Sequence, residues 1–289
     1  MRGKMSEAYN DWVGRSEMAR DIVTAGLVDR LEATLDSGVR RDGAALRPLG
    51  HWCLFLPQTP QSQIGTDGHA VRGGFLPPVH HLPRRMWAGS SLTFHGDMHI
   101  GMAVERRSII SSVTRKQGAS GELVFVTVRH EISQAGGTLL VSEEHDIVYR
   151  GAMGAAVKLS GETAQAGMWR RELVPDAVLL FRYSALTFNG HRIHYDRPYV
   201  TEVEGYPGLI VHGPLIATLL LDLVHRHMPG AAITAYSFRA LSPVFDGANL
   251  SLHGSPPDGE GLIKLWACTD DGRVAMRAEA HIARQDVIS

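Results

Sequence analysis

The clearest alternation of hydrophobic and polar positions lies near the C-terminal end of the chain. Over residues 274–283 every second side chain is apolar, and arginine, glutamate and histidine occupy three of the positions between them. A period of two is typical of a strand that buries one face and exposes the other. Residues 233–241 and Leu262–Cys268 are also rich in β-branched and apolar side chains. We therefore expect three strands in this part of the chain.

A similar pair of strands is expected in the first half. Residues 123–128 form a β-branched and aromatic run, a turn follows at Gly136-Gly137, and residues 139–149 predict a second strand. Residues 262–283 repeat this plan of strand, glycine turn and strand. The repetition indicates an internal duplication of one structural unit.

Two segments have the spacing of helices. Gly213-Pro214 opens the clearer one, because a proline in the first turn of a helix leaves no hydrogen bond unmade. Its apolar face consists of Ile216, Leu219, Leu220 and Leu223, beside a narrow polar stripe of Thr218, Asp222 and Arg226. Residues 12–35 also have apolar side chains near helical spacing, and Ser37-Gly38 ends the pattern. An apolar helix followed by long antiparallel strands predicts an α+β protein whose sheet wraps around a buried helix.

Two stretches without periodicity divide the chain. Residues 57–89 are rich in proline, glycine and histidine, and their apolar content favours an ordered loop over the body of the protein. Residues 151–167 are small and polar, as is typical of a linker between domains. The 289-residue chain is long enough for two domains, and we expect them at residues 1–155 and 165–289.

Composition narrows the functional classes. A chain with 44% hydrophobic and 20% charged residues suits a soluble globular protein. Its 29 basic residues balance 30 acidic ones, so there is no basic excess for binding nucleic acid. No apolar run is long enough to cross a membrane, and none follows the basic N-terminus as in a secretory signal. Cys53 and Cys268 have no metal-binding spacing and are expected to be buried thiols of a cytoplasmic protein.

The residues best suited to chemistry lie just before the predicted helix at Gly213. Asn189, His191, His194 and Asp196 fall within one short stretch. A histidine with a pKa near neutrality can take up and return protons. An amide can orient water, a carboxylate can orient an imidazole, and the N-terminus of a helix stabilises negative charge on an oxygen. The stretch therefore predicts an acid–base site at the start of the helix.

This stretch resembles the active-site signature of the MaoC-like, R-specific enoyl-CoA hydratases, which runs roughly Asp-x-Asn-Pro-x-His. Asn189 stands at the position of the aspartate, His194 stands at that of the histidine, and His212-Gly213 matches the His-Gly that opens the central helix. The resemblance implies that His194 is the general base and that His191 assists it. It also implies an oxyanion contact from the backbone N–H of Gly213, because the following proline has no N–H to offer. Asn189 departs from the pattern: an amide cannot act as a base, so we expect it to orient water or a histidine.

The first half resembles the N-terminal region of two-repeat MaoC-like dehydratases. The resemblance rests on residues 82–90, 116–121 and 124–131, and within that group the chain is most similar to the mesaconyl-CoA (3-methylfumaryl-CoA) hydratases. It implies a double hot-dog fold, with two antiparallel sheets each wrapped around a central helix. The C-terminal repeat would carry the acid–base residues, and the degenerate N-terminal repeat would shape the acyl pocket and bind coenzyme A. No separate cofactor and no metal are expected, and the exposed outer strands are compatible with a homodimer.

The implied reaction is the reversible addition of water to a 2-enoyl-CoA with a short branched or dicarboxylic acyl chain, such as mesaconyl-CoA or itaconyl-CoA. Coenzyme A carries several phosphate charges, so basic side chains are expected near it. The candidates for binding it are Arg84, Arg85, Trp87, Arg115 and Lys116. A guanidinium among them could also hold the distal carboxylate of a dicarboxylic acyl group in a bidentate arrangement.

Three other interpretations stay open at this point. A hot-dog thioesterase would use a carboxylate near the central helix, for which Asp222 is the candidate. A non-catalytic acyl-thioester-binding protein would account for the asparagine at position 189. A metal oxygenase would use histidines at ligand spacing, such as His95 with His99 or His191 with His194. The sequence shows no carboxylate at a suitable third position, which argues against the metal oxygenase.

Overall fold

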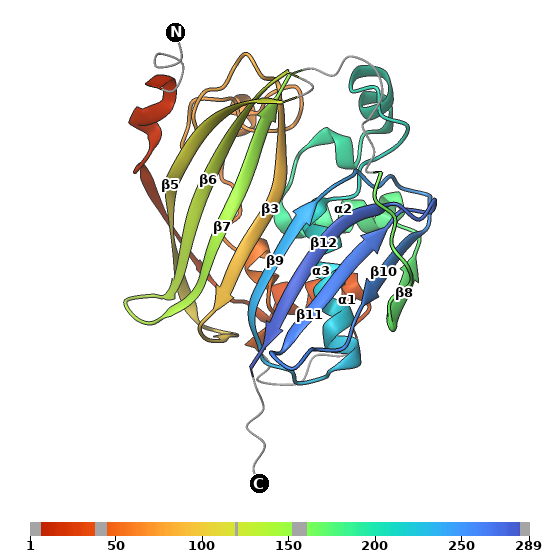
Figure 1. The fold of residues 1–289 in the computed structure, drawn as a ribbon. Helices are drawn as coiled ribbons and strands as arrows, with labels where there is room; N and C mark the ends of the chain where they lie inside the picture. The colour runs from red at the N-terminus through yellow and green to blue at the C-terminus, as the bar shows by residue number, and fades with distance from the viewer. Residues whose placement is uncertain (1–6, 38–44, 119–120, 152–160, 284–289) are drawn as a thin grey trace.

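A ten-stranded antiparallel sheet forms the centre of the computed structural model, which describes residues 7–37, 45–118, 121–151 and 161–283 (Figure 1). Its strands are β1 (Ser16–Ile22), β3 (Arg84–Phe94), β5 (Ala103–Gly118), β6 (Gly121–Gln134), β7 (Leu139–Arg150), β8 (Trp169–Leu173), β9 (Ile233–Ala240), β10 (Leu250–Gly254), β11 (Leu262–Cys268) and β12 (Val274–Ile282). A separate pair is formed by β2 (Ala45–Leu46) and β4 (Met98–His99). The described α-helices are α1 (Ala25–Leu35), α2 (Ala177–Thr187) and α3 (Gly213–His227). Short helical turns are η1 (Glu7–Trp12), η2 (Gly50–Cys53), η3 (Gln61–Gln63), η4 (Arg192–His194) and η5 (Tyr199–Val203).

The large sheet consists of two halves with the same connectivity. From the outer edge to the middle, the first half has the order β1-β5-β6-β7-β3, and the second half has the order β8-β10-β11-β12-β9. In each half the first strand in sequence forms the outer edge, the second lies in the middle of the sheet, and the other three lie between them. The topology therefore contains the internal duplication that the sequence predicts.

The two halves meet where β3 pairs with β9. The register joins Gly89 to Arg239 and Thr93 to Ala235. Gly89 lies so close to the carbonyl oxygen of Phe238 that an added Cβ atom would overlap it, so this junction requires glycine. The two sheets expected from the sequence are thus joined edge to edge into one continuous sheet.

Helix α3 lies against the second half of the sheet. Its residues from Leu215 to Val224 are all buried, and it packs against β8, β10, β11 and β12. Figure 1 shows α1, α2 and α3 on this same face, behind the strands of the second half. Burying a leucine-sized side chain contributes roughly 1.5–3 kcal/mol, so α3 is a main source of stability in this half. The helix predicted to start at Gly213 is confirmed.

The inner face of the first half is covered by a loop. Val79 and Leu82, which precede β3, pack on Val126 and Tyr149 of the sheet. The ordered loop expected over residues 57–89 is therefore present, although its last residues belong to β3.

The helix predicted for residues 12–35 is wrong in its first part. Strand β1 occupies Ser16–Ile22, and α1 begins only after it. Thr24 caps α1 by accepting a hydrogen bond from the Leu27 N–H (3.2 Å). The β1 residues pair with the edge of β5, and Ile22, which contributed to the apparent helical spacing, is 53% exposed. Pairing with the sheet edge therefore overrides the local pattern.

The boundary between the two expected domains falls mostly on residues that are not described. Residues 152–160 of the expected linker lie outside the described ranges, so the division into 1–155 and 165–289 stays a prediction. No helix in the described part of the chain has the length and hydrophobicity needed to span a membrane.

Candidate active site

His194 lies in η4, shortly before the start of α3, and only 7% of its surface is exposed. Its Nδ1 is 2.7 Å from the carbonyl oxygen of Ile210. A carbonyl can only accept, so Nδ1 carries the proton and Nε2 of the neutral ring keeps its lone pair. Burial lowers the pKa of His194 to about 4, which keeps the ring neutral at pH 7. His194 is therefore held as a neutral imidazole whose acceptor atom is Nε2.

His212 stands at the N-terminus of α3 and stacks on His194, with 3.7 Å between the ring centroids and 17° between the planes. Its Nε2 lies 2.9 Å from Oγ of Ser184, and burial lowers its pKa well below the ordinary value. The His212 side chain does not cap the helix, and a Cβ added to Gly213 would meet open space. The first turn of α3 thus offers N–H groups beside a space that a thioester oxygen can enter.

Asn189 and His191 lie in the loop between α2 and η4. Asn189 Oδ1 accepts a hydrogen bond from the backbone N–H of His191 (3.0 Å), which forms a local turn. The His191 ring is nearly perpendicular to that of His194, with 5.5 Å between centroids. Burial, followed by the charges of His69 and His194, lowers the pKa of His191 to about 2. The structure therefore brings His191 and His194 together, and Asn189 orients the His191 backbone.

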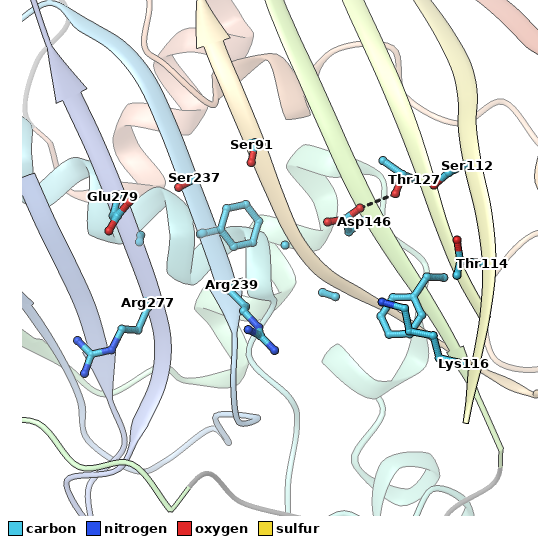
Figure 2. Close-up of a pocket in the computed structure, with 15 residues that line it drawn as sticks. Ser91, Ser112, Thr114, Lys116, Thr127, Asp146, Ser237, Arg239, Arg277 and Glu279 are labelled. Carbon is cyan, nitrogen blue, oxygen red and sulfur yellow. Dashed lines mark hydrogen bonds between the residues drawn. The ribbon is translucent and has the colours of Figure 1, made fainter. Parts of the chain in front are cut away.

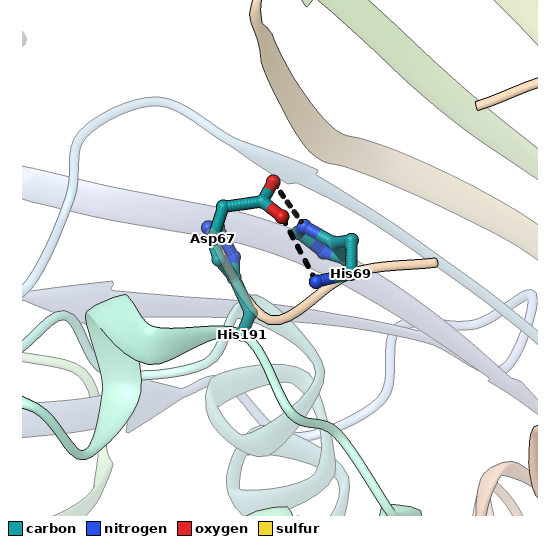
Figure 3. Close-up of side chains that lie close together, drawn as sticks. All are labelled: Asp67, His69 and His191. Atoms are coloured by element: carbon teal, nitrogen blue, oxygen red, sulfur yellow. Dashed lines mark hydrogen bonds and ion pairs between the residues drawn. The ribbon is translucent and has the colours of Figure 1, made fainter. Parts of the chain in front are cut away.

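A loop from the first half adds a carboxylate and a further imidazole that were not expected from the sequence. Asp67 Oδ2 lies 2.9 Å from His69 Nδ1, and Asp67 Oδ1 accepts the backbone N–H of His69 (3.0 Å). The His69 ring lies 4.0 Å from that of His191, and Figure 3 shows the Asp67–His69 pair beside His191. The available signal was the Asp67-Gly68 dipeptide, which is typical of a turn. Nothing in the sequence places that turn against residue 191.

Asp67 is ionised at neutral pH. Burial opposes its charge, but hydrogen bonds from His69 and the charges of His69 and His191 outweigh burial and lower the pKa of Asp67. Burial also lowers the pKa of His69, with Asp67 acting in the opposite direction and the charge of Arg85 adding to the decrease. The pair is thus a carboxylate beside a neutral imidazole.

Arg84 and Arg85 have different surroundings. Arg84 contacts the carboxylate of Glu204 (2.9 Å) and donates to the Glu204 carbonyl oxygen (2.8 Å). Arg85 lies in the β3–β7 ladder opposite Tyr149, and within the described part of the chain its side chain has no hydrogen bond or ion pair. Its positive charge, after burial, contributes to the lowered pKa of His69 and of His191. Arg85 is therefore near these histidines with its donors free.

Trp87 and Arg115 have partners within the first half. Trp87 donates from Nε1 to Ser90 Oγ (3.0 Å) and stacks on His145 at 3.9 Å. Arg115 forms an ion pair with Glu122 (2.5 Å) across the β5–β6 hairpin. Both side chains are therefore bound to other residues of the first half, and the structure does not bring them to His194.

Lys116 points into a hollow on the face of the sheet opposite α3 (Figure 2). The hollow has a volume of about 660 Å³ and spans the junction of β3 and β9. Arg239 and Arg277 line its other end, and Lys116 Nζ lies 4.7 Å from the ring of Phe125. None of the site histidines lines this hollow, so Lys116 is separated from them by the sheet.

Asp196 has partners other than an imidazole. It pairs with Arg192 (2.8 Å) and accepts the backbone N–H of Tyr199 (3.1 Å). The role of orienting a histidine, expected from its place in the sequence, therefore falls to other groups.

Asp222 is buried in the middle of an ion cluster, with only 1% of its surface exposed. Its oxygens lie 2.9 Å from Arg47, 2.8 Å from Arg171 and 2.6 Å from Arg226. Burial opposes the charge of Asp222, but Arg47 and Arg226 outweigh it and lower the pKa of Asp222. A carboxylate held by three arginines is not available to attack a thioester, which argues against a thioesterase built on this residue.

The arrangement is suited to general acid–base chemistry on a thioester. His194 offers an unprotonated Nε2, the first turn of α3 offers N–H groups for an oxyanion, and the Asp67–His69 pair offers a second site for a proton.

Comparisons with known proteins agree with this chemistry. The family model of hydroxyacyl-thioester dehydratase type 2 matches residues 49–246. The chain is 45% identical to the mesaconyl-C(4)-CoA hydratase of Chloroflexus aurantiacus over 276 residues, which cover 94% of this chain and 96% of that protein. A solved MaoC-like dehydratase superposes with a TM-score of 0.72 at 15% identity, covering 96% of this chain and 100% of its own.

A Mycobacterium tuberculosis protein described as having a double hot-dog fold superposes with a TM-score of 0.56 at 14% identity, covering 93% of this chain and 96% of its own. The α+β double hot-dog fold expected from the sequence is thereby confirmed. The family match covers more than half of the chain and includes both Asp67 and His194. The chain therefore belongs to the hydroxyacyl-thioester dehydratase type 2 family and is a hydro-lyase.

Proposed function

We propose that this protein reversibly adds water to the double bond of a dicarboxylic 2-enoyl-CoA, and that its substrate is mesaconyl-CoA with the thioester at C4. The observation that carries the proposal is the state of His194, a buried neutral imidazole whose Nδ1 is bound to Ile210 and whose Nε2 is unprotonated. The choice of acyl chain is supported by the 45% identical relative, which is named mesaconyl-C(4)-CoA hydratase.

His194 acts as the base in the direction of hydration. Its Nε2 takes a proton from water while the water oxygen forms a bond to the β-carbon of the enoyl group. The electron pair of the double bond moves toward the thioester oxygen, where the Gly213 N–H and the N-terminus of α3 stabilise the negative charge. A proton is then delivered to the α-carbon, with His191 assisting. Dehydration follows the same steps in reverse.

Arg85 is the group suited to the free carboxylate of the acyl chain. A carboxylate is costly to bury without a partner, and a guanidinium holds it with two parallel hydrogen bonds. Arg84 is bound to Glu204, whereas the Arg85 donors have no partner among the described residues. Arg85 therefore takes the distal carboxylate and gives the site its preference for a dicarboxylic substrate.

The proposal is tested by following the loss of enoyl-thioester absorbance with mesaconyl-CoA, itaconyl-CoA and crotonyl-CoA. We expect the highest kcat/KM with mesaconyl-C4-CoA and a hydroxyacyl-CoA product. Release of free coenzyme A would favour a thioesterase instead. Tight binding of all three compounds without turnover would favour an acyl-thioester-binding protein.

Arg85→Gln tests the choice of a dicarboxylic substrate. Loss of a charge-assisted pair should raise KM for mesaconyl-C4-CoA by about 10- to 100-fold and leave KM for crotonyl-CoA nearly unchanged. Lys116→Gln is the matched control, because it removes a positive charge on the opposite face of the sheet. Equal losses for both substrates in Arg85→Gln would assign Arg85 to coenzyme A rather than to the carboxylate.

A further inference from the structure

The chain has an asparagine where the hydratase signature has its aspartate, and an aspartate from the first half lies beside the same loop. Asn189 Oδ1 is bound to the backbone N–H of His191 (3.0 Å). Asp67, His69 and His191 form a group in which one side-chain nitrogen or oxygen of each lies within 4.8 Å of the others. The Asp67 carboxylate thus lies beside the loop in which the signature has an aspartate and this chain has Asn189.

The loop that carries Asp67 is held against the site by hydrogen bonds from the backbone and side chain of Arg192 and by close backbone packing at Gly68. The Arg192 N–H donates to the carbonyl oxygen of Asp67 (2.9 Å), and Arg192 Nη1 donates to that of Thr66 (2.9 Å). Gly68 has a φ of +90°, and a Cβ atom there would overlap the carbonyl oxygen of Gly190. Only glycine permits both this φ and this approach. The carboxylate is therefore fixed next to residues 190–192 by the fold itself.

The Asp67–His69 pair has the geometry of a carboxylate that positions a catalytic imidazole (Figure 3). The Asp67 carboxylate accepts a hydrogen bond from the N–H at Nδ1 of His69 (2.9 Å). This contact fixes the tautomer, leaves Nε2 as the atom that exchanges protons, and stabilises the imidazolium when it forms. The His69 ring lies 4.0 Å from that of His191, which lies 5.5 Å from that of His194. Imidazoles therefore form a continuous row from the base to the carboxylate.

We propose that the first half supplies the carboxylate of this active site, with Asp67 positioning His69 and with His69 delivering the proton to the α-carbon. This inference rests on the proposed function. The proton that His194 takes from water passes by way of His191 to His69 Nε2, and from there to the α-carbon. An O–H bond of water and the π bond of the enoyl group break, the O–C and C–H bonds form, and each imidazole ends with the charge with which it began. Asp67 is a positioning residue, and His69 is the catalytic one.

The test asks whether a carboxylate at position 189 replaces the one at position 67. Asp67→Asn should lower kcat about 100-fold with little change in KM, as expected when an acid–base group loses its partner. Adding Asn189→Asp to Asp67→Asn should recover at least about tenfold of that loss, because it restores the carboxylate of the family signature. Asn189→Asp alone is the control for folding.

Two results would overturn the inference. One is a kcat for Asp67→Asn within about threefold of wild type, since acid–base partners contribute far more than this. The other is a double variant that folds but is no faster than Asp67→Asn. In the second case Asp67 only stiffens its loop, and a carboxylate at position 189 cannot take its place.

A nitrogen NMR measurement of the histidine rings tests the contact without any substrate. Wild-type His69 should carry its proton on Nδ1, and Asp67→Asn should leave a mixture of tautomers. Asp258→Asn is the matched control, because Asp258 accepts hydrogen bonds from the backbone N–H groups of Glu260 and Leu262 rather than from an imidazole. An unchanged His69 signal in Asp67→Asn would overturn the inference. A wild-type protein that hydrates no enoyl-CoA would instead reject the proposed function, and this readout would still report on Asp67.

Metal analysis of the purified protein tests whether these side chains bind a metal ion instead. A divalent ion bound at a one-to-one ratio in the wild type and lost in Asp67→Asn would overturn the acid–base role. Asp67, His69 and His191 would then be metal ligands.

Discussion

The two halves of the sheet have the same strand order, but different side chains cover their inner faces. In the second half, α3 buries an unbroken run from Leu215 to Val224 against the strands. In the first half, the buried carboxylate of Glu143 occupies the inner face and accepts hydrogen bonds from Ser90 Oγ (2.8 Å) and Trp52 Nε1 (3.2 Å). The second half is therefore stabilised by an apolar helix, whereas the first half combines the apolar cluster under its loop with a buried polar network.

The comparison also shows that a shifted pKa does not by itself mark an active site. Burial lowers the pKa of His145 in the first half and of His194 in the second, in both cases to about 4. The two rings differ in their contacts. His145 stacks on Trp87 inside the first half, whereas His194 stacks on His212 at the uncapped start of α3. Access to a helix N-terminus, rather than protonation, separates the imidazole that we propose as the base from the one inside the first half.

Replacing each of these two histidines should separate catalysis from structure. His194→Ala should lower kcat by about 10²–10⁴-fold with little change in KM, because it removes the base. His145→Ala should leave kcat within about threefold of wild type and lower the thermal midpoint, because it leaves a cavity beside Trp87. Steady-state kinetics and thermal unfolding of both variants measure the difference. Near-normal turnover by His194→Ala would show that the base lies elsewhere.

Glu143→Ala should give the largest loss of stability in the first half. Removing one partner of a buried charged network typically costs about 3–5 kcal/mol, and here it leaves Ser90, Trp52 and His51 without their acceptor. Urea unfolding measures the loss, and kcat of the folded fraction should stay close to wild type. A selective loss of kcat with unchanged stability would instead place Glu143 in the chemistry of the site.

Much of the second half could be predicted from the sequence because its signals are local. The Gly213-Pro214 start, the apolar face of α3 and the alternation in β12 depend on residues close together in the chain. β1 could not be predicted, because its pairing partner β5 is far away in sequence and its own apolar side chains are exposed. α2, β8 and β10 were also not expected. β8 and β10 have five residues each and carry little periodic signal. α2 has apolar side chains on its exposed face as well as its buried one, so it lacks the polar stripe that marks a helix.

The candidate site likewise contains residues that a local sequence signal indicates and residues that no local signal indicates. His191, His194 and the start of α3 are neighbours in sequence, and a motif found them. Asp67 and His69 lie in an irregular loop more than a hundred residues earlier, and contacts of this loop with Gly190, His191 and Arg192 hold them at the site. Of the two adjacent arginines, the sequence could not tell which one is bound to Glu204 and which one is free.

Acid should destabilise both halves by the same mechanism. Burial lowers the pKa of His130 to about 3 and that of His145 and His194 to about 4, below an unfolded value of about 6.5. Between pH 6.5 and pH 4 the unfolded chain binds protons that the folded chain does not, so stability falls as the pH falls. Each such histidine contributes about 1.4 kcal/mol per pH unit.

The urea midpoint between pH 7 and pH 4.5 measures this slope. His145→Ala and His194→Ala should each make the slope shallower by a similar amount. Each variant removes one histidine that takes up a proton when the chain unfolds. If His145→Ala changes the slope and His194→Ala does not, His194 is already protonated in the folded protein. That result would conflict with its role as a base. The carboxylate of Glu143, whose pKa is lowered to about 2, should add its own loss of stability only below about pH 4.5.

The smallest effect is expected at Lys116, which the sequence predicts as a contact of coenzyme A. Its ammonium lies over Phe125 on the face of the sheet opposite α3, and substitutions at such exposed positions usually change free energies by about 0.5 kcal/mol or less. Lys116→Ala should therefore change KM for the acyl-CoA by about twofold at most and leave kcat unchanged. A rise in KM of tenfold or more, weakened by added salt, would mean that the phosphates of coenzyme A reach the outer face. The sheet junction between β3 and β9, rather than the helix face alone, would then be part of the binding site, and both halves would contact coenzyme A, just as we propose that both supply acid–base residues.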